Sequence, residues 1–64
     1  MDVEVVAERV RAEFEEMPGM TLTMPQASRL FGIERDVCRT IVERLVTTSY
    51  LRWTNTGSVT RAAR

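Results

Sequence analysis

The segment from Thr23 to Gly32 constrains the fold most, because it carries the signals for both ends of one helix. Thr23 and Gln26 form a T-x-x-Q capping box, in which the two side chains satisfy free backbone donors at a helix start. Gly32 predicts the end of the helix, since only glycine enters the left-handed conformation without steric cost. The sequence therefore predicts a helix of about eight residues. Its buried stripe is expected to be Ala27, Leu30 and Phe31.

A longer amphipathic helix is predicted before this segment, over about residues 2–17. Asp2 is placed to cap it, and Pro18 disfavours helical geometry at the residue that precedes it. The apolar face consists of Val3, Val6, Ala7, Val10, Phe14 and Met17. The charged face offers two pairs spaced for contact across one turn, Arg9–Glu13 and Arg11–Glu15.

A third helix is predicted over about 35–48, followed by a change of period from 3.6 to 2. The alternation over 50–61, interrupted by the turn signal Asn55-Thr56-Gly57, predicts a β-hairpin. Residues 20–22 are long enough only for an edge strand, and residues 62–64 are expected to fray. A chain of 64 residues forms one domain, so residues 1–64 are interpreted as a single unit. The apolar stripe of the third helix is Cys38, Ile41, Val42, Leu45 and Val46.

Three stretches of the sequence carry a family resemblance. They are Leu22-Thr23-x-x-Gln26-Ala27-Ser28-x-Leu30-Phe31-Gly32-Ile33, then Cys38-x-x-Ile41-Val42-x-x-Leu45-Val46, then Leu51-Arg52 with the Gly57-containing turn. Together they resemble the winged helix-turn-helix domain of bacterial regulators of the MarR and IclR kind. The resemblance covers nearly the whole chain. It implies a mainly α (α+β) fold of three helices, a short edge strand and a C-terminal β-hairpin wing.

The same resemblance implies a small DNA-binding protein, a transcriptional regulator with double-stranded DNA as its partner. The helix over 35–48 would enter the major groove, and the hairpin over 50–61 would lie on the backbone. The base contacts that it implies are Arg35, Arg39, Thr40 and Glu43. The backbone contacts are Thr23, Gln26, Arg44, Arg52, Asn55, Thr56 and Arg61, with Ser58 and Thr60 as further hydroxyls of the wing. The alternative for these side chains is a solvated surface in which Arg39 pairs with Glu43.

Two positions depart from the family pattern. Ser49 stands after the third helix where many relatives have glycine, and Trp53 stands in the wing strand where a second basic residue is usual. The indole removes one implied phosphate contact, and a large ring in so small a protein is expected to pack against the sheet or a partner.

The net charge of zero hides an asymmetry along the chain. Residues 1–28 carry six acids and two arginines, a net of −4, whereas residues 29–64 carry three acids and seven arginines, a net of +4. Such a separation can orient a protein on a polyanion even when its total charge is nil.

Several functions are disfavoured by what the sequence lacks. There is no histidine and only one cysteine, so no metal site, cofactor or redox centre is expected, and Cys38 is interpreted as a core residue. No nucleophile constellation or phosphate loop points to an enzyme or to a small-molecule substrate. The acidic N-terminus and the absence of a long apolar run favour the cytoplasm over a membrane.

A protein-interaction module is the alternative function, because a fold does not determine its use. Val5, Tyr50 and Trp53 would then be the anchors of a docking surface. A single DNA-binding module makes a small interface, so a homodimer through the helix over 2–17 is also considered.

Overall fold

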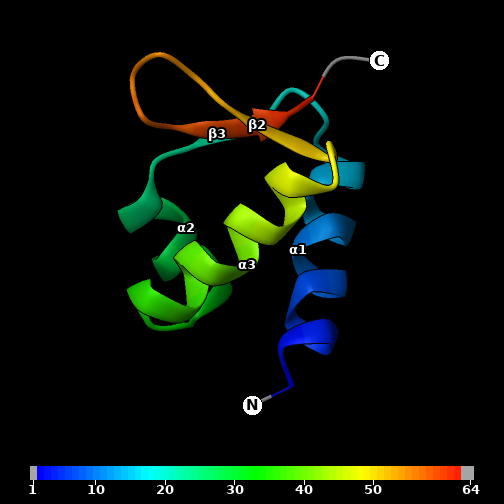
Figure 1. Ribbon diagram of the computed structural model, residues 1–64, viewed down its shortest axis with the longest axis vertical. Coiled ribbons are helices and arrows are strands. Elements are labelled where there is room, and N and C mark those ends of the chain that lie inside the picture. Colours follow the sequence, from blue (N-terminus) through cyan, green and yellow to red (C-terminus); the bar gives the residue numbers. More distant parts are fainter. Residues whose placement is uncertain (1, 63–64) are drawn as a thin grey trace.

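Three helices and three short strands form the fold, as a computed structural model of the protein shows for residues 2–62 (Figure 1). The elements are α1 Val3–Glu16, β1 Thr21–Leu22, α2 Met24–Phe31, α3 Arg35–Thr47, β2 Leu51–Trp53 and β3 Val59–Arg61. Each expected helix and strand is confirmed, with bounds within one or two residues of those predicted. The fraying expected at the C-terminus concerns Ala63 and Arg64, which lie outside the described residues.

The helix starts follow from their capping residues. The Asp2 carboxylate accepts the backbone N–H of Glu4 at 3.0 Å. At α2 both halves of the capping box form: the Thr23 hydroxyl accepts the N–H of Gln26 at 3.2 Å, and the Gln26 side chain accepts the N–H of Thr23 at 2.9 Å. Local hydrogen bonds thus fix where two of the three helices begin.

Two helices end in the same left-handed turn, but only one of them uses glycine. Gly32 after α2 and Ser49 after α3 both have φ of +67°. In each turn the next residue donates its N–H back across the last helical turn, Ile33 to the carbonyl of Ser28 at 3.1 Å and Tyr50 to that of Leu45 at 2.9 Å. Ser49 therefore adopts a left-handed conformation that glycine enters freely, at a steric cost of about 1–2 kcal/mol.

The sheet is antiparallel, with β3 between β1 and β2. Thr60 of β3 pairs with Thr21 on one side and with Arg52 on the other, and its neighbour Val59 pairs with Leu22 and Trp53. The expected hairpin and edge strand are therefore both present. Figure 1 shows α3 crossing the middle of the molecule between α1 and α2, with the sheet across one end.

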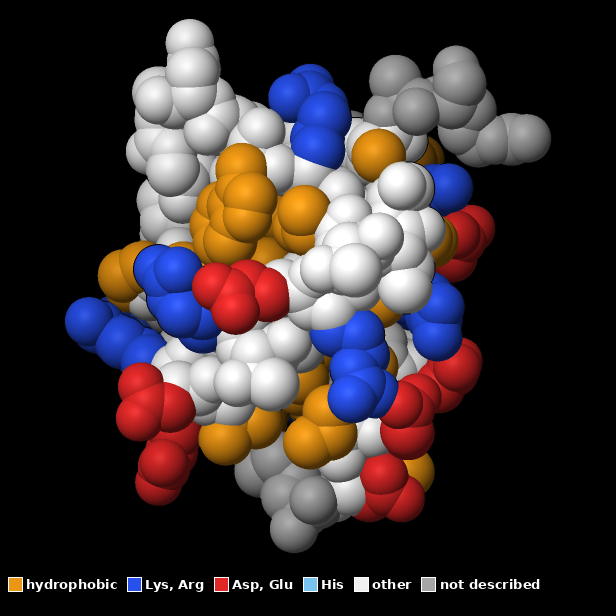
Figure 2. All heavy atoms as spheres, viewed as in Figure 1, with side chains coloured by type: hydrophobic (Ala, Val, Ile, Leu, Met, Phe, Trp, Pro, Cys, Tyr) orange, Lys and Arg blue, Asp and Glu red, His pale blue; other side chains and the backbone are white. Residues whose placement is uncertain are grey.

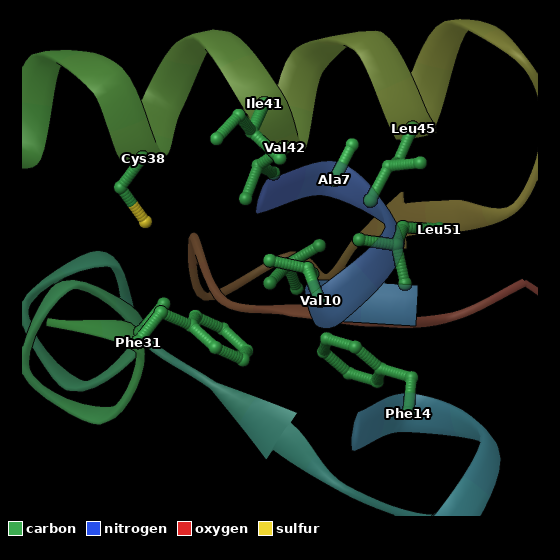
Figure 3. Close-up of a cluster of buried hydrophobic side chains, with 11 residues drawn as sticks. Ala7, Val10, Phe14, Phe31, Cys38, Ile41, Val42, Leu45 and Leu51 are labelled. Carbon is green, nitrogen blue, oxygen red and sulfur yellow. The ribbon is translucent and has the colours of Figure 1, made fainter. Parts of the chain in front are cut away.

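The core lies where α3 meets the other elements. Cys38, Ile41, Val42 and Leu45 are all at most 1% exposed. In Figure 3 Val42 and Leu45 point from α3 toward side chains of α1, Cys38 points toward Phe31 of α2, and the rings of Phe14 and Phe31 point toward each other below the helix. The whole buried cluster is Ala7, Val10, Phe14, Ala27, Phe31, Cys38, Ile41, Val42, Leu45, Leu51 and Val59.

The buried stripe predicted for α2 is wrong at Leu30, which is 46% exposed. A helix of eight residues meets its neighbours along one row only, and Ala27 and Phe31, one turn apart, form that row. Leu30 lies about 100° around the helix from Phe31. The stripe is therefore narrower than the sequence pattern indicated.

The two charge pairs expected on α1 are also wrong in their partners. Arg11 pairs with Glu8 at 3.1 Å instead of with Glu15, and Arg9 donates to the carbonyl oxygen of Phe31 at 3.1 Å instead of pairing with Glu13. An arginine side chain is long enough to reach a backbone carbonyl at the end of α2, an acceptor that helical spacing alone does not reveal.

Exchanging serine and glycine between the two left-handed turns should change stability in opposite directions. We expect Ser49→Gly to raise the free energy of unfolding by about 0.5–1 kcal/mol, because it removes the steric cost at φ +67° but gives the unfolded chain more freedom. Gly32→Ser should lower it by a similar amount, since a Cβ there meets no atom within 4 Å and only the backbone is strained.

Thermal unfolding measures both effects, because 1 kcal/mol shifts the midpoint of a domain this small by about 4–8 °C. A loss of stability in Ser49→Gly would contradict the assignment of this turn.

Candidate nucleic-acid interface

The outer side of α3 carries all four residues for which base contacts were predicted. Arg35, Arg39, Thr40 and Glu43 are exposed, because the opposite side of the helix is buried in the core. Arg39 and Glu43 form an ion pair at 3.4 Å, and the Thr40 hydroxyl donates to the carbonyl of Asp36 at 3.0 Å. The predicted base-contact residues thus share one helix surface, and two of them contact each other.

Trp53 joins this surface to the hairpin. The guanidinium carbon of Arg39 lies 5.8 Å from the centre of the Trp53 ring. Trp53 is half-buried at the end of β2 and packs against the core cluster. The outer surface of α3 therefore continues onto Trp53 of β2, whereas Arg52, the residue before Trp53, is exposed on the opposite side of the strand.

The hairpin turn is held by the Thr54 hydroxyl. This oxygen accepts the N–H of Thr56 at 3.3 Å and that of Ser58 at 3.1 Å, and it lies 3.0 Å from the Thr56 hydroxyl. Gly57 closes the turn by donating to the Thr54 carbonyl at 3.1 Å, with φ of +81°. Asn55 and Thr56 are exposed at the tip, as expected for residues of a wing.

Two hydroxyls expected on the wing surface are buried instead. Ser58 is 7% exposed and Thr60 is 9% exposed. The Thr60 hydroxyl donates to the carbonyl of Met20 at 2.8 Å, which ties the central strand to the chain before β1. Both side chains are buried and the Thr60 hydroxyl already has a backbone partner, so the expectation that these two hydroxyls face phosphate is wrong.

Thr23 and Gln26 lie together at the start of α2, where both are exposed. The capping box uses the Thr23 hydroxyl and the Gln26 carbonyl oxygen as acceptors. The amide nitrogen of Gln26 and the Thr23 hydroxyl proton can still donate to another group. The structure keeps these two predicted backbone contacts at the surface, one turn apart on the same helix.

Arg44 and Arg61 are turned toward α1 instead. Arg44 forms an ion pair with Glu4, and Arg61 forms one with Glu15 at 3.2 Å. Arg61 pairs with Leu51 in the sheet register, so it lies on the side of the sheet that faces the helices, and its side chain is only 26% exposed. These two arginines therefore hold α1 to the rest of the molecule.

Tyr50 lies between two arginines, Arg11 and Arg61, and together they form a second arginine cluster. No sequence signal indicated this cluster. The Tyr50 hydroxyl donates to the Glu15 carboxylate at 2.6 Å and lies 3.1 Å from the carbonyl oxygen of Arg11. The guanidinium carbons of Arg61 and Arg11 lie 4.7 and 5.8 Å from the ring centre. Burial, followed by the hydrogen bond to Glu15, raises the pKa of Tyr50 above its ordinary value.

Part of the charge asymmetry of the sequence is neutralised by ion pairs within the molecule. Two acids of the first half, Glu4 and Glu15, pair with two arginines of the second half, Arg44 and Arg61. Figure 2 shows basic and acidic side chains interspersed on the visible face, without a continuous basic patch. Arg29, Arg35 and Arg52 are the exposed arginines of the second half for which no ion pair occurs within residues 2–62.

Two further features of the molecule are a depression on α2 and the thiol of Cys38. An open depression of about 490 Å³ is lined by Pro25, Gln26, Arg29 and Leu30 on α2. The Cys38 thiol is buried, and burial raises its pKa. Within the described part of the chain there is no cluster of metal-ligating side chains, and no helix is long and apolar enough to cross a bilayer.

Comparison of the sequence and structure with protein-family models, curated proteins and solved structures finds no significant match.

Arg61 and Arg52 should differ in their effect on stability, although both are arginines of the hairpin. We expect Arg61→Ala to lower the free energy of unfolding by about 1 kcal/mol, because it removes the ion pair to Glu15 and the contact with the Tyr50 ring. Arg52→Ala, at an exposed position, should change it by less than about 0.5 kcal/mol. Urea unfolding of the two variants makes the comparison, and equal values would contradict the assignment of Arg61 to the fold.

Tyr50 should make the protein sensitive to alkaline pH. Since its pKa is raised in the folded state, the neutral hydroxyl stabilises the fold below about pH 10, and this contribution is lost as the pH rises through the folded-state pKa. Tyr50→Phe should therefore lose less stability than the unchanged chain above that pH. Cys38 is the same in both proteins, so the difference between their unfolding curves isolates Tyr50.

Proposed function

We propose that the chain is a winged helix-turn-helix module that binds double-stranded DNA, with α3 in the major groove and the β2–β3 hairpin on the backbone. The observation that carries the proposal is the contact between Arg39 of α3 and Trp53 of β2. This contact makes the exposed side of α3 continuous with the side of the hairpin on which Trp53 lies. A recognition helix and its wing need this continuity to engage the same duplex.

The dimensions and chemistry of α3 fit such a role. A helix of 13 residues is about 20 Å long. Its diameter with side chains is about 10–12 Å, so it can enter the major groove, which is about 12 Å wide. Arg35 and Arg39 can each donate two hydrogen bonds to guanine, and Glu43 can accept one from cytosine. In this proposal, these side chains read bases, and Thr40 contacts either a base or a sugar.

Backbone contacts are assigned to the exposed polar groups around α3. They are Arg52, Asn55 and Thr56 of the hairpin together with Thr23 and Gln26 at the start of α2. Arg44 and Arg61 would have to leave their carboxylate partners on α1 to reach phosphate. Arg44 and Arg61 are therefore expected to contribute less to DNA binding than the other residues that the sequence predicted as backbone contacts.

Binding by one copy should be weak, because a single module covers only about 600–1,000 Å² of its own surface. Two copies on adjacent half-sites would raise the affinity without new contacts to DNA. The exposed side of α1, which includes Val5 and Ala12, is the proposed surface for pairing. A bacterial transcriptional regulator that acts as a dimer is the biological role most consistent with this arrangement.

The test is the binding of a fluorescently labelled duplex pool, followed by anisotropy at about 50 and 200 mM salt. We expect binding at low salt that weakens as salt is raised. Arg35→Ala should weaken binding to the duplexes that the protein prefers by about fivefold or more and leave binding to random DNA nearly unchanged. Arg52→Ala should weaken all sequences alike and reduce the salt slope by about 1.

Arg29→Ala is the matched control, since it removes the same charge from an exposed position on α2 that is assigned no contact with DNA and lies about one turn beyond Gln26. It should change affinity much less than Arg52→Ala. No binding to any duplex at low salt would refute the proposal, and equal effects of Arg29→Ala and Arg52→Ala would refute the assigned surface.

Protein docking is the second candidate, favoured by the depression on α2. Leu30 there is 46% exposed and lies beside Pro25, and Val5 on α1 is 64% exposed. Tyr50 and Trp53, expected as anchors of such a surface, are half-buried and engaged by arginines. A docking function would therefore rest on Leu30 and Val5.

A further inference from the structure

Trp53 and Arg39 form a contact whose two partners differ in exposure. The indole is half-buried, packs against the core cluster and sits opposite Val59, which is fully buried in the central strand. Arg39 is an exposed side chain, with 59% of its surface accessible. A ring packed against the core thus lies beside an exposed guanidinium.

Glu43 restrains the same guanidinium from a second position. One of its carboxylate oxygens lies 3.4 Å from the Arg39 terminal nitrogen. A free arginine loses up to about 2 kcal/mol of side-chain entropy when it is fixed in one rotamer. Two supports, one aromatic and one anionic, reduce that loss on binding because part of it has already occurred in the free protein.

We infer that Trp53 is a positioning residue that presets the Arg39 guanidinium, together with Glu43, to read a guanine in duplex DNA. This inference rests on the proposed function and deepens it. Of the aromatic side chains, tryptophan gives the strongest cation–π attraction.

The pairing of Arg39 with Glu43 also indicates which base pair is read. The guanidinium can donate to O6 and N7 of a guanine, while the carboxylate can accept from N4 of a cytosine. Both requirements are met by G·C pairs. The carboxylate also repels phosphate, which disfavours other placements of the helix on the duplex. The expected target therefore contains a G·C pair opposite the middle of α3.

The test begins with in vitro selection from a duplex pool with a random central segment, using the full chain. Each guanine of an enriched duplex is then replaced in turn by 7-deaza-dG, which lacks the N7 acceptor. Besides any guanine that Arg35 reads, we expect one position, the guanine that Arg39 reads, at which this replacement weakens binding by about tenfold. Arg39→Ala should abolish the penalty at that position alone.

The variants at Trp53 separate positioning from packing. Trp53→Leu should shrink the 7-deaza-dG penalty by about threefold, the size of an exposed cation–π contact, and Trp53→Phe should retain most of it. Tyr50→Leu is the matched control, because it removes the aromatic partner of the other arginine cluster and should leave the penalty unchanged. Circular dichroism and thermal unfolding establish that each variant is folded.

Glu43→Gln tests the same inference without touching the core, since Glu43 is exposed. Removing the charge should shrink the 7-deaza-dG penalty and strengthen binding to unrelated duplexes. A residue with only a structural role would move neither quantity in this way.

The protein contains a single tryptophan, so Trp53 fluorescence reports on the contact directly. Arg39→Ala should make the indole more accessible to acrylamide in the free protein, and binding of the selected duplex should make it less accessible in the unchanged chain. If folded Trp53→Leu keeps the full penalty, or if selection enriches no guanine, the inference is wrong while DNA binding stands. Failure to bind any duplex at low salt refutes the proposed function itself.

Discussion

The burial of one side of α3 is the constraint on which the rest of the structure depends. Cys38, Ile41, Val42 and Leu45 are all at most 1% exposed, and α1, α2 and the sheet are arranged around them. Each of these side chains contributes about 1–3 kcal/mol by leaving water, a large share for a chain of 64 residues. Because α3 must be buried on one side, its other side is left at the surface, and that is where Arg35, Arg39 and Glu43 lie.

The fold could be predicted well from the sequence because its signals are local. The capping box at Thr23, the glycine at Gly32 and the change of period at Tyr50 each act through neighbouring residues. Leu30 was the exception: spacing shows which residues can share a side of a helix, but the width of the buried stripe depends on how many elements cover it. In α2 the stripe is narrow, and Leu30 remains exposed.

The candidate site was less predictable, because it depends on contacts between residues far apart in the sequence. Strand alternation places Arg61, two residues after Val59, on the core side of the sheet and Arg52 on the other side, but no local pattern shows that Arg61 binds Glu15 across 46 positions of the chain. The same holds for Trp53, which could have packed on the sheet or met a partner and in fact lies against the core with Arg39 above it.

The turn of the hairpin also affects how a protein of this kind can change over generations. Its backbone is closed by the Thr54 hydroxyl and by Gly57, so Asn55 and Thr56 at the tip are free of the core. Mutations at these two positions can alter the surface that the hairpin presents without lowering the stability of the domain. Lengthening the loop is also inexpensive, at about 0.6 kcal/mol for each doubling. The tip is therefore the part of the molecule where new binding preferences can arise at least cost to folding.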